Sequence, residues 1–490
     1  MNKLLLYLAG LLAALLLVAA VHTAMVTPRR PDITRKPGAQ FEVDAAARRL
    51  GVALQFHTES LVATIAHGGA EFDRFHAFLE QTFPLVHAHL KLEKVNRFSL
   101  LYTWPGKNPA LKPALLMCHQ DVVPVSPGTE GNWKHPPFSG EIAEGCVWGR
   151  GALDVKSGLM GQLEAVERLL ADGFQPERTI YFAFGHDEEI GGQQGALQIV
   201  RLLQSRHIQL ESVLDEGGQV TIGVIPGVKP PVAMIGVAEK GYATLQLAVN
   251  ATGGHSSMPP PASAIGILSA AVSRVEAHPF PADLRHVNAL NLHVAAAMAW
   301  PQRLVVTNPW LFDWLITRIV ARSPSTDAMQ RTTTAPTIIA GGNKDNVLPP
   351  EAHALVNFRL LPGQTKDSLI NRITKVVADP RVEISLYTGS GSSEPSPVSP
   401  TDSTSYRILE RTIYETLPED DAIVTPYLVM GGTDAKHYTP LTPNVYRFVM
   451  NRYTPADLGL FHGTNERIPV ANYVQVISFY HRLIQNLQQP

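Results

Sequence analysis

Cysteine is scarce in this 490-residue chain, which contains only Cys118 and Cys146. Two cysteines cannot supply a disulfide framework, so they exclude a disulfide-stapled fold and leave the redox compartment open. Net charge is also small, because 41 lysines and arginines stand against 43 acids, which gives −2. A chain so close to neutral gives no reason to expect nucleic acid as a partner. No internal repeat is visible in the sequence.

The bulk composition is that of a folded protein with more than one domain. Hydrophobic residues make up 45% of the chain and charged residues 17%, which excludes wholesale disorder. A chain of 490 residues is longer than a domain with a single hydrophobic core usually is, so two domains are expected.

The one long hydrophobic run lies near the N-terminus. Residues 4–21 read LLLYLAGLLAALLLVAAV, which is long enough to cross or nearly cross a bilayer. Basic residues stand on both sides of this run, so they do not fix its orientation. We expect residues 1–25 to form a single membrane anchor. The alternative is a cleaved signal peptide, which would leave a secreted or periplasmic protein.

A linker rich in proline and basic residues is expected at 26–40, and an α/β domain follows it. Three apolar runs predict strands, at residues 113–118, 179–184 and 212–214. Between the first two, Leu159, Leu163, Val166 and Leu170 recur at helical spacing. Alternation of strands and helices predicts a mainly parallel sheet.

The pattern changes after Tyr242. Alternating strands and intervening helices predict a smaller α+β domain over residues 242–390, inserted between two parts of the catalytic domain at 41–241 and 391–490. Inside it, residues 278–335 form an apolar stretch. Packed helices are the expected structure there, and a membrane-facing or partner-facing helix is the alternative.

Acidic side chains and histidines follow the predicted strands. His119 and Asp121 follow the first, Glu188 and Glu189 the second, and Asp215 and Glu216 the third, while Asp154 precedes the intervening helix. Ligands of an open α/β sheet bind beyond the carboxyl ends of its strands, so these loops are expected to meet. Carboxylates concentrated at one edge would repel one another unless a cation neutralised them.

Imidazole together with carboxylate favours zinc or a similar divalent ion. A single calcium ion is a poor alternative, because histidine is not one of its usual ligands. A second imidazole is available from His462 in the loop LGLFHGTNERIP. A lone histidine after a strand is usually structural, and an isolated pair of glutamates is usually on the surface. The joint occurrence of several such loops is what indicates a metal site.

Six motifs in fixed order carry a resemblance to a known family. CHQDVVPV, GRGALDVKSG, GHDEEIGG, LDEGG, GGHSSMPP and FHGTNE resemble those of the M20 family of zinc peptidases, over roughly residues 45–485. The length, the anchor and the inserted stretch are most similar to the branch of carboxypeptidase S and the N-acyl-amino-acid hydrolases. The resemblance implies a zinc-dependent exopeptidase-like catalytic domain and an inserted lid or dimerisation domain.

The resemblance also implies a ligand set for two zinc ions per subunit. His119 and Asp215 would bind one ion, Glu189 and His462 the other, and Asp154 would bridge them, with Glu216 as the alternative to Asp215. Asp121 would accept the imidazole N–H of His119 and fix its tautomer. The family often has a cis peptide after the bridging acid, here Asp154–Val155, although Val155 stands where the family usually has a second aspartate.

Further roles are implied for residues around the ligands. Glu188 would act as the general base while a hydroxide bridging the two zinc ions attacks the scissile carbonyl. His255 would stabilise the oxyanion, in some members across a dimer interface, and Arg359 would pair with the substrate carboxylate. Other candidate substrate-binding residues are Asn346, Gly432 and Thr433. Closure at hinges near 240–243 and 390–396 would bring the two domains together.

The expected function is hydrolysis of an amide bond next to a free carboxylate. The main hypothesis is a carboxypeptidase or dipeptidase acting on short peptides of Gly-Xaa type. The alternative is a hydrolase of N-acyl amino acids, including N-fatty-acyl ones. A non-catalytic binding protein is a third hypothesis, which the presence of every expected ligand and of Glu188 disfavours. A homodimer formed through the inserted domain is also expected.

Overall fold

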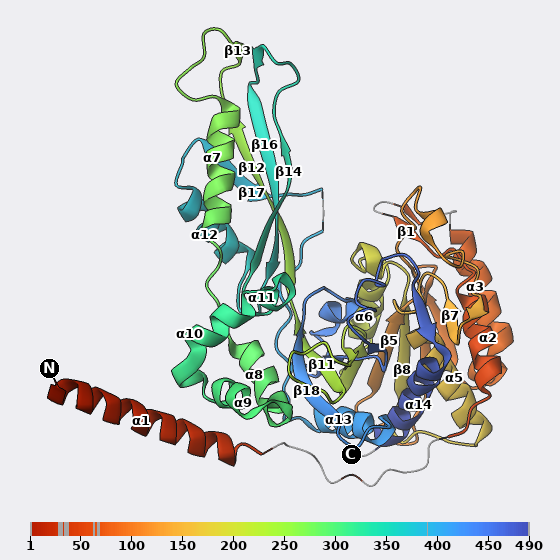
Figure 1. Ribbon diagram of the computed structural model, residues 1–490. Helices are drawn as coiled ribbons and strands as arrows, with labels where there is room; N and C mark the ends of the chain where they lie inside the picture. The colour runs from red at the N-terminus through yellow and green to blue at the C-terminus, as the bar shows by residue number, and fades with distance from the viewer. Residues whose placement is uncertain are drawn as a thin grey trace.

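A computed structural model describes residues 2–27, 33, 39–61, 64–65, 69–389 and 391–488. Most of the linker expected at 26–40, namely 28–32 and 34–38, lies outside these residues, and so does residue 390 of the second hinge. Figure 1 shows a broad lobe with helices packed around a sheet, a narrow lobe that projects from it, and an N-terminal helix that extends below the narrow lobe.

A ten-stranded sheet forms the core of the broad lobe, in the order β20-β10-β11-β19-β9-β5-β8-β4-β3, with β18 also paired to β11. The strands are β3 (Lys91–Val95), β4 (Ser99–Trp104), β5 (Ala114–His119), β8 (Ile180–Gly185), β9 (Ser212–Asp215), β10 (Gln219–Thr221), β11 (Val232–Glu239), β18 (Ile423–Val429), β19 (Val445–Arg447) and β20 (Arg452–Tyr453). The four strands β8, β5, β9 and β19 are parallel to their neighbours in this series. β5 and β8 are buried along their whole length, as expected for strands covered on both faces.

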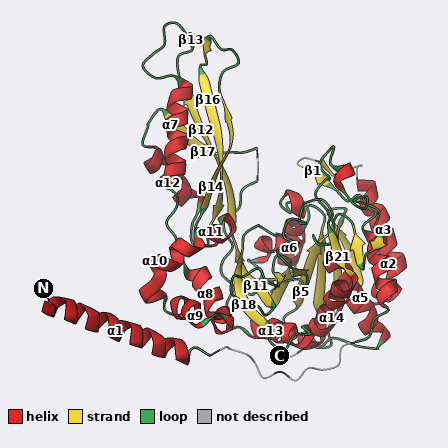
Figure 2. Cartoon of the chain, in the orientation of Figure 1, coloured by secondary structure: helices red, strands yellow, loops and turns green. Residues whose placement is uncertain are grey.

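Helices cover both faces of this sheet (Figure 2). The larger core cluster includes residues of α2 (Val43–Ala53), α5 (Lys156–Ala171), α13 (Thr404–Thr416) and α14 (Val470–Asn486). The cluster on the other face includes residues of α6 (Ala196–Ser205) and of the short helix η5 (Asp434–Tyr438). Gly161 lets α5 approach α14, because a Cβ there would lie 2.8 Å from Cγ1 of Val476.

Shorter elements complete the broad lobe. They are β1 (Ser60–Leu61), β2 (Thr64–Ile65), α3 (Ala70–Thr82), α4 (Pro84–His89), η2 (Glu130–Asn132), β6 (Ile142–Ala143), β7 (Cys146–Trp148), η3 (Glu188–Ile190) and β21 (Arg467–Pro469). β21, β7 and β6 form a small antiparallel sheet, which links the loop before β21 to the region before α5.

The narrow lobe has its own antiparallel sheet in the order β14-β16-β12-β17. Its strands are β12 (Gly241–Asn250), β14 (Thr333–Ala340), β16 (Glu351–Leu360) and β17 (Val382–Leu386), and two helices, α7 (Ala264–Ala277) and α12 (Lys366–Val377), contribute to its separate hydrophobic core. At its far end β13 (Gly254–His255) pairs with β15 (Val347–Leu348). This lobe is the α+β unit that the sequence pattern predicts.

The apolar stretch at 278–335 forms a group of short helices at the base of the narrow lobe. They are α8 (Arg285–Val294), η4 (Ala295–Ala297), α9 (Trp300–Thr307), α10 (Pro309–Val320) and α11 (Pro324–Gln330). Leu290 and Val294 of α8 pack against Val232 and Met234 of β11. The N-terminal helix α1 (Asn2–Met25) contacts α9.

The two lobes are joined where the chain leaves and re-enters the broad lobe. Tyr242 and Ser393 exchange two backbone hydrogen bonds, of 2.9 and 2.8 Å, so the two connections run side by side. The predicted fold class, an α/β catalytic domain with a mainly parallel sheet and an inserted α+β domain, is confirmed. The domain boundaries assigned from the sequence stay a prediction.

Candidate active site

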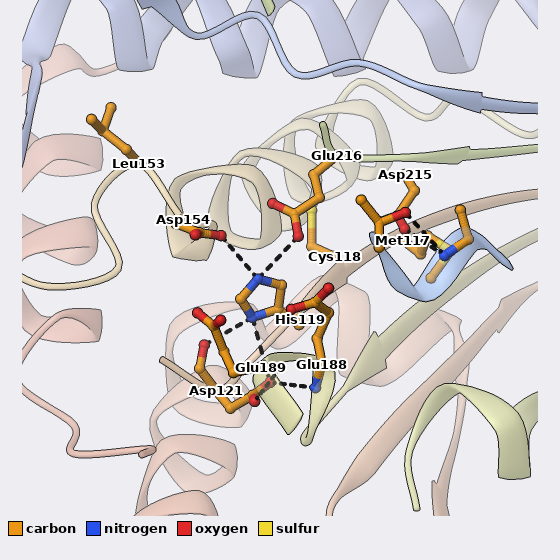
Figure 3. A network of polar contacts seen from close by, with 12 residues as sticks. Met117, Cys118, His119, Asp121, Leu153, Asp154, Glu188, Glu189, Asp215 and Glu216 are labelled. Carbon is orange, nitrogen blue, oxygen red and sulfur yellow. Dashed lines mark hydrogen bonds and ion pairs between the residues drawn. The ribbon is translucent and has the colours of Figure 1, made fainter. Parts of the chain in front are cut away.

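His119 lies at the centre of a polar cluster where strands of the large sheet end (Figure 3). It is the last residue of β5 and is 2% exposed. Its Nε2 atom is 3.1 Å from Oδ1 of Asp154 and 3.1 Å from Oε1 of Glu216. Asp154 precedes α5, and Glu216 follows β9. Three loops from separate parts of the chain therefore meet at one imidazole.

A second histidine approaches the same aspartate from the other side. Nε2 of His462 is 2.8 Å from Oδ2 of Asp154 and 3.4 Å from Oε2 of Glu189. The two oxygens of Asp154 thus face two different histidines. Among the described residues, the groups able to hold a metal ion are His119 with Asp154 and Glu216, His119 with Glu188 and Glu189, and Asp154 with Glu189 and His462.

A buried ion pair fixes the loops that carry Asp154 and His462. Arg150 and Glu466 form a contact of 2.7 Å and are both almost fully buried. Oε1 of Glu466 accepts hydrogen bonds from the backbone N–H of Leu153, at 2.8 Å, and of Asp154, at 3.2 Å. Arg150 also donates to the carbonyl oxygen of His462. This pair therefore sets the position of both residues.

The peptide bond Asp154–Val155 is cis, as the family resemblance implies.

The sequence predicts that Asp121 accepts the imidazole N–H of His119. In the structure the nearer acceptor on Asp121 is its backbone carbonyl oxygen rather than its carboxylate. Nδ1 of His119 lies 2.8 Å from the backbone carbonyl oxygen of Asp121 and 3.4 Å from its carboxylate. The carboxylate instead accepts hydrogen bonds from the backbone N–H groups of Glu188, at 3.2 Å, and Glu189, at 3.1 Å. Asp121 thus fixes the tautomer of His119 chiefly through its main chain, and its side chain holds the turn that presents both glutamates.

Burial and crowding perturb the acids of the cluster. Burial raises the pKa of Glu188 well above its usual value, and repulsion from Glu189 and Glu216 adds to the rise. Burial, with the charges of Asp154 and Asp215, raises the pKa of Glu216 to about 8. Burial and the charge of Asp154 also raise the pKa of Glu189. These carboxylates favour added positive charge, from protons or from a metal ion.

The histidines show the complementary effect. Burial opposes the charge of His119, but Glu216, Asp121 and Asp154 outweigh it and raise its pKa well above the usual value. Hydrogen bonds to Asp154 and Glu189 raise the pKa of His462 to about 10. The pKa of Asp154 falls because both histidines counter the effect of its burial.

The donor set fits divalent metal ions. It combines imidazole with carboxylate oxygens, the combination expected for zinc. Oε1 of Glu189 is buried and has no hydrogen-bond partner among the described residues. Such an orphaned buried oxygen is costly unless something binds it, and a metal ion held between Asp154, Glu189 and His462 would do so.

At the end of β9, the third predicted strand, the structure favours Glu216 over Asp215 as a candidate metal ligand. Asp215 is buried, and its Oδ2 accepts a hydrogen bond of 2.8 Å from the backbone N–H of Ala435. Its carboxylate is not part of any of the metal-binding groups found among the described residues. Of the two candidates that the sequence leaves open, the contacts therefore favour Glu216, and the identity of the ligand stays a prediction. Strand alternation explains the difference, because adjacent side chains point to opposite sides.

Two of the residues expected near the substrate lie far from this cluster within one chain. His255 is exposed in β13, at the far end of the narrow lobe (Figure 1), where its Nδ1 contacts the hydroxyl of Ser257 at 2.8 Å. Asn346 is also exposed there, and its carbonyl oxygen accepts from the backbone N–H of Ser256. In a single chain in this arrangement neither His255 nor Asn346 lies beside the metal-binding cluster, so their roles at an active site stay predictions.

Arg359 lies at the other end of the same lobe. It is near the end of β16, where it pairs with Tyr242, and its guanidinium lies 4.7 Å from the centre of the Tyr242 ring. The rise of an extended strand places it about 27 Å from Glu351 at the far end of β16. Burial lowers the pKa of Arg359. It is thus close to the connection between the lobes rather than to His255.

The glycine loop before η5 divides into an exposed and a buried part. Gly432 is exposed. Thr433 is buried, and its hydroxyl donates a hydrogen bond of 2.8 Å to Glu239, which also pairs with Arg447. In this arrangement the hydroxyl of Thr433 faces the interior, and a role of Gly432 or Thr433 in substrate binding stays a prediction.

Sequence reasoning missed the pair of Arg150 and Glu466. Arg150 lies inside the motif GRGALDVKSG and Glu466 inside the motif FHGTNE. The available signal was Glu466 itself, an acid four residues after the candidate ligand His462. This signal alone did not indicate a role, because no local sequence pattern shows that the loops carrying Arg150 and Glu466 meet.

Comparison with known proteins identifies the family. The model of peptidase family M20/M25/M40 matches residues 115–486. The chain belongs to the M20 family. It is therefore a metal-dependent hydrolase, as predicted. The family model begins at β5 and ends within α14, so it includes every member of the cluster.

Relatives across the M20 family match nearly the whole chain. A probable carboxypeptidase S-like protein of Dictyostelium discoideum is 40% identical over 490 residues, covering 98% of this chain and 93% of the relative. The human N-fatty-acyl-amino acid synthase/hydrolase is 39% identical over 488 residues, covering 97% of this chain and 95% of the relative. The predicted branch is confirmed.

Solved structures of the M20 family share the fold. A metallo-carboxypeptidase from Sulfolobus solfataricus has a TM-score of 0.61 at 18% identity, covering 92% of this chain and 100% of that chain. Human carnosine dipeptidase 1 has a TM-score of 0.59 at 16% identity, covering 91% of this chain and 97% of that chain.

Replacement of Glu216 tests the assignment of the ligand. Glu216→Gln removes a charged oxygen next to His119 and is expected to lower the content of bound divalent metal, measured by elemental analysis of the purified protein. Asp215→Asn keeps an oxygen that can accept from Ala435 and is expected to retain the full metal content. Loss of metal from Asp215→Asn alone would reverse the assignment.

Replacement of Glu466 tests its supporting role. Glu466→Gln leaves Arg150 without its charged partner and is expected to weaken metal affinity about 10-fold to 100-fold, as for residues that position metal ligands. Competition with a chelator measures this affinity. Glu164→Gln, which breaks the partly exposed pair with Arg49, is the matched control and should leave affinity unchanged. Equal affinities in both variants would contradict the role.

Proposed function

We propose that this M20 enzyme hydrolyses an amide bond adjacent to a free carboxylate, as a carboxypeptidase or dipeptidase on short peptides. The observation that carries the proposal is Asp154, whose two oxygens face His119 and His462 at 3.1 and 2.8 Å. This arrangement of one shared carboxylate between two imidazoles suits two metal ions. Glu188 lies beside the same cluster.

The metal we propose is zinc, two ions per subunit. His119 and Glu216 would hold one ion, Glu189 and His462 the other, and Asp154 would bridge them. Bound there, the two ions would polarise the scissile carbonyl and lower the pKa of an attacking water.

Glu188 is proposed as the general base. Its backbone N–H is held by Asp121, and its carboxylate is within reach of the cluster. Because its pKa is raised by burial, it can accept a proton from water and pass it to the leaving nitrogen, which is the behaviour expected of a general base and acid.

The inserted domain is proposed to supply the rest of the site. The exposed position of His255 at the tip of the narrow lobe supports a role in a second subunit, so that a homodimer would bring His255 and Asn346 to the partner's cluster. Arg359, near the connection between the lobes, would bind the substrate carboxylate through its planar guanidinium. The paired connections at Tyr242 and Ser393 would act as the hinge, and Gly432 would line the site.

A second candidate function is hydrolysis of N-fatty-acyl amino acids. Two observations favour it. The human relative is named an N-fatty-acyl-amino acid synthase/hydrolase and is similar along nearly its whole length. The base of the narrow lobe also carries exposed apolar side chains in α9 and α10, which suit a lipidic environment.

The localisation we propose is the membrane, through α1 as a single anchor. Residues Lys3–Met25 are long and apolar enough to cross a bilayer, with a mean hydropathy of 2.8. A cleaved signal sequence passes the same test and would give a secreted or periplasmic enzyme.

A hydrolysis screen with two variants tests the function and mechanism together. Wild-type protein with zinc is expected to release the C-terminal amino acid from Gly-Xaa dipeptides, and activity on N-fatty-acyl amino acids would support the second candidate. Glu188→Ala should lower kcat at least about 100-fold, within the usual contribution of a general acid–base group, with two zinc ions retained. Glu189→Ala should lose metal as well as activity. No turnover of either substrate class by metal-loaded wild type would contradict the proposal.

Mixing two inactive variants tests the role of His255 across a dimer. His255→Ala leaves the metal cluster intact, and Glu188→Ala leaves the tip intact. If His255 acts in the partner subunit, co-expressed variants should form mixed dimers with one complete site, and activity should return. Met258→Ala, which removes an 80% exposed side chain at the same tip, is the control for simple disturbance of the loop. Full activity of His255→Ala alone would contradict the role.

A further inference from the structure

The tryptophans of this chain divide sharply between the two lobes. Trp104, Trp133 and Trp148 in the broad lobe are between 4 and 7% exposed. The three in the helical group at the base of the narrow lobe, Trp300, Trp310 and Trp314, are 56, 55 and 60% exposed. A folded protein seldom leaves several large aromatic side chains in water without a binding partner.

Two of these tryptophans form a face of α10. Trp310 and Trp314 are four residues apart and so lie one above the other on the helix. Ile316, which is 3% exposed, lies on the opposite, inward side. Arg318 continues the outer face, with its guanidinium 5.7 Å from the centre of the Trp314 ring. The outward face of α10 therefore combines aromatic rings with a cation.

The same region holds the C-terminal end of α1 through buried polar contacts. Asn308, fully buried between α9 and α10, donates hydrogen bonds to the carbonyl oxygen of Ala19, at 3.2 Å, and to the hydroxyl of Thr23, at 2.9 Å. Thr23 also contacts the hydroxyl of Thr307 at 2.8 Å. These contacts fix the last turns of α1 against the helical group, below the narrow lobe in Figure 1.

Trp310 connects the outward face of α10 with the polar contacts that hold the end of α1. Its indole N–H donates a hydrogen bond of 3.3 Å to Oδ1 of Asn308, and the same oxygen contacts Nδ1 of His22 in α1 at 3.1 Å. Trp310 therefore lies beside the point where the apolar run of α1 gives way to polar residues. That is the position at which aromatic belts mark the edge of a membrane.

The dimensions of α1 agree with this position. Residues 3–20, which precede the polar end, span about 27 Å as a helix, and the hydrocarbon core of a bilayer is about 30 Å thick. Only 6% of the most apolar window of α1 is buried inside the protein. If these residues cross the bilayer, the end held by Asn308 lies at the level of the lipid headgroups.

We propose that α10 rests on the surface of a phospholipid bilayer next to the membrane-spanning α1. Trp310 and Trp314 insert at headgroup depth, and the exposed Arg318 and Arg322 face lipid phosphates. Tryptophan favours this zone because one end of its ring is apolar and the other donates a hydrogen bond. The continuity of this face with α1 favours lipid over a second copy of the chain. The inference rests on the anchor role proposed for α1 and is independent of the catalytic proposal.

Quenching of tryptophan fluorescence by brominated lipid tests the inference. The full chain, with its N-terminus checked by intact mass, is reconstituted into lipid nanodiscs whose phospholipid carries bromine close to the headgroup. Compared with unbrominated discs, wild-type emission is expected to fall. The double variant Trp310→Phe/Trp314→Phe should lose most of this quenching. Trp104→Phe, which removes a buried tryptophan of the broad lobe, is the matched control and should keep it.

The outcomes distinguish a failure of this inference from a failure of the anchor role of α1 and from a failure of the catalytic proposal. Equal quenching in wild type and the double variant, or none in either, would overturn the inference, including the case in which a second copy of the chain covers the face. Extraction of the chain from membranes by alkaline carbonate would overturn the anchor role and this inference with it. Peptide hydrolysis is measured on the same samples, so a failure of the catalytic proposal is seen independently.

Discussion

Repulsion between buried carboxylates is the constraint on which this structure depends. Asp154, Glu188, Glu189 and Glu216 lie close to one another at one end of the large sheet, each largely shielded from water. Such a cluster is destabilising unless positive charge compensates it. Two histidines provide part of that compensation, and the orphaned oxygen of Glu189 indicates that they do not provide all of it. A pair of divalent ions would satisfy the remainder, and the same charge would drive hydrolysis.

Neighbouring strands and buried polar residues hold the candidate metal ligands in position. β5, β8 and β9 are parallel neighbours, so their carboxyl ends deliver His119, Glu188 and Glu216 to one edge. Asp121 fixes the turn of the glutamates, and the pair of Arg150 and Glu466 joins the loops of Asp154 and His462. Each of these supports is itself buried. The candidate ligands are therefore held in place by residues outside the candidate metal-binding groups, as is usual for metal sites.

Much of this arrangement could be predicted from local sequence. Runs of apolar residues identified β5, β8 and β9, and the acids after them identified the edge where they meet. The choice between Asp215 and Glu216 could not be made, because it depends on which side of a strand's end each side chain points to and on the N–H of Ala435, 220 residues away. The burial of Thr433 likewise depends on Glu239 and Arg447. The position of His255 depends on how the lobes, and any second subunit, are arranged, which no local pattern encodes.

Anomalous X-ray scattering at the zinc absorption edge, from crystals of the metal-loaded protein, tests whether two metal ions compensate the buried carboxylates. We expect two peaks about 3.5–4 Å apart, with Asp154 between them, His119 beside one and His462 beside the other. A folded protein that shows no peak in this cluster, or a single peak elsewhere, would contradict it.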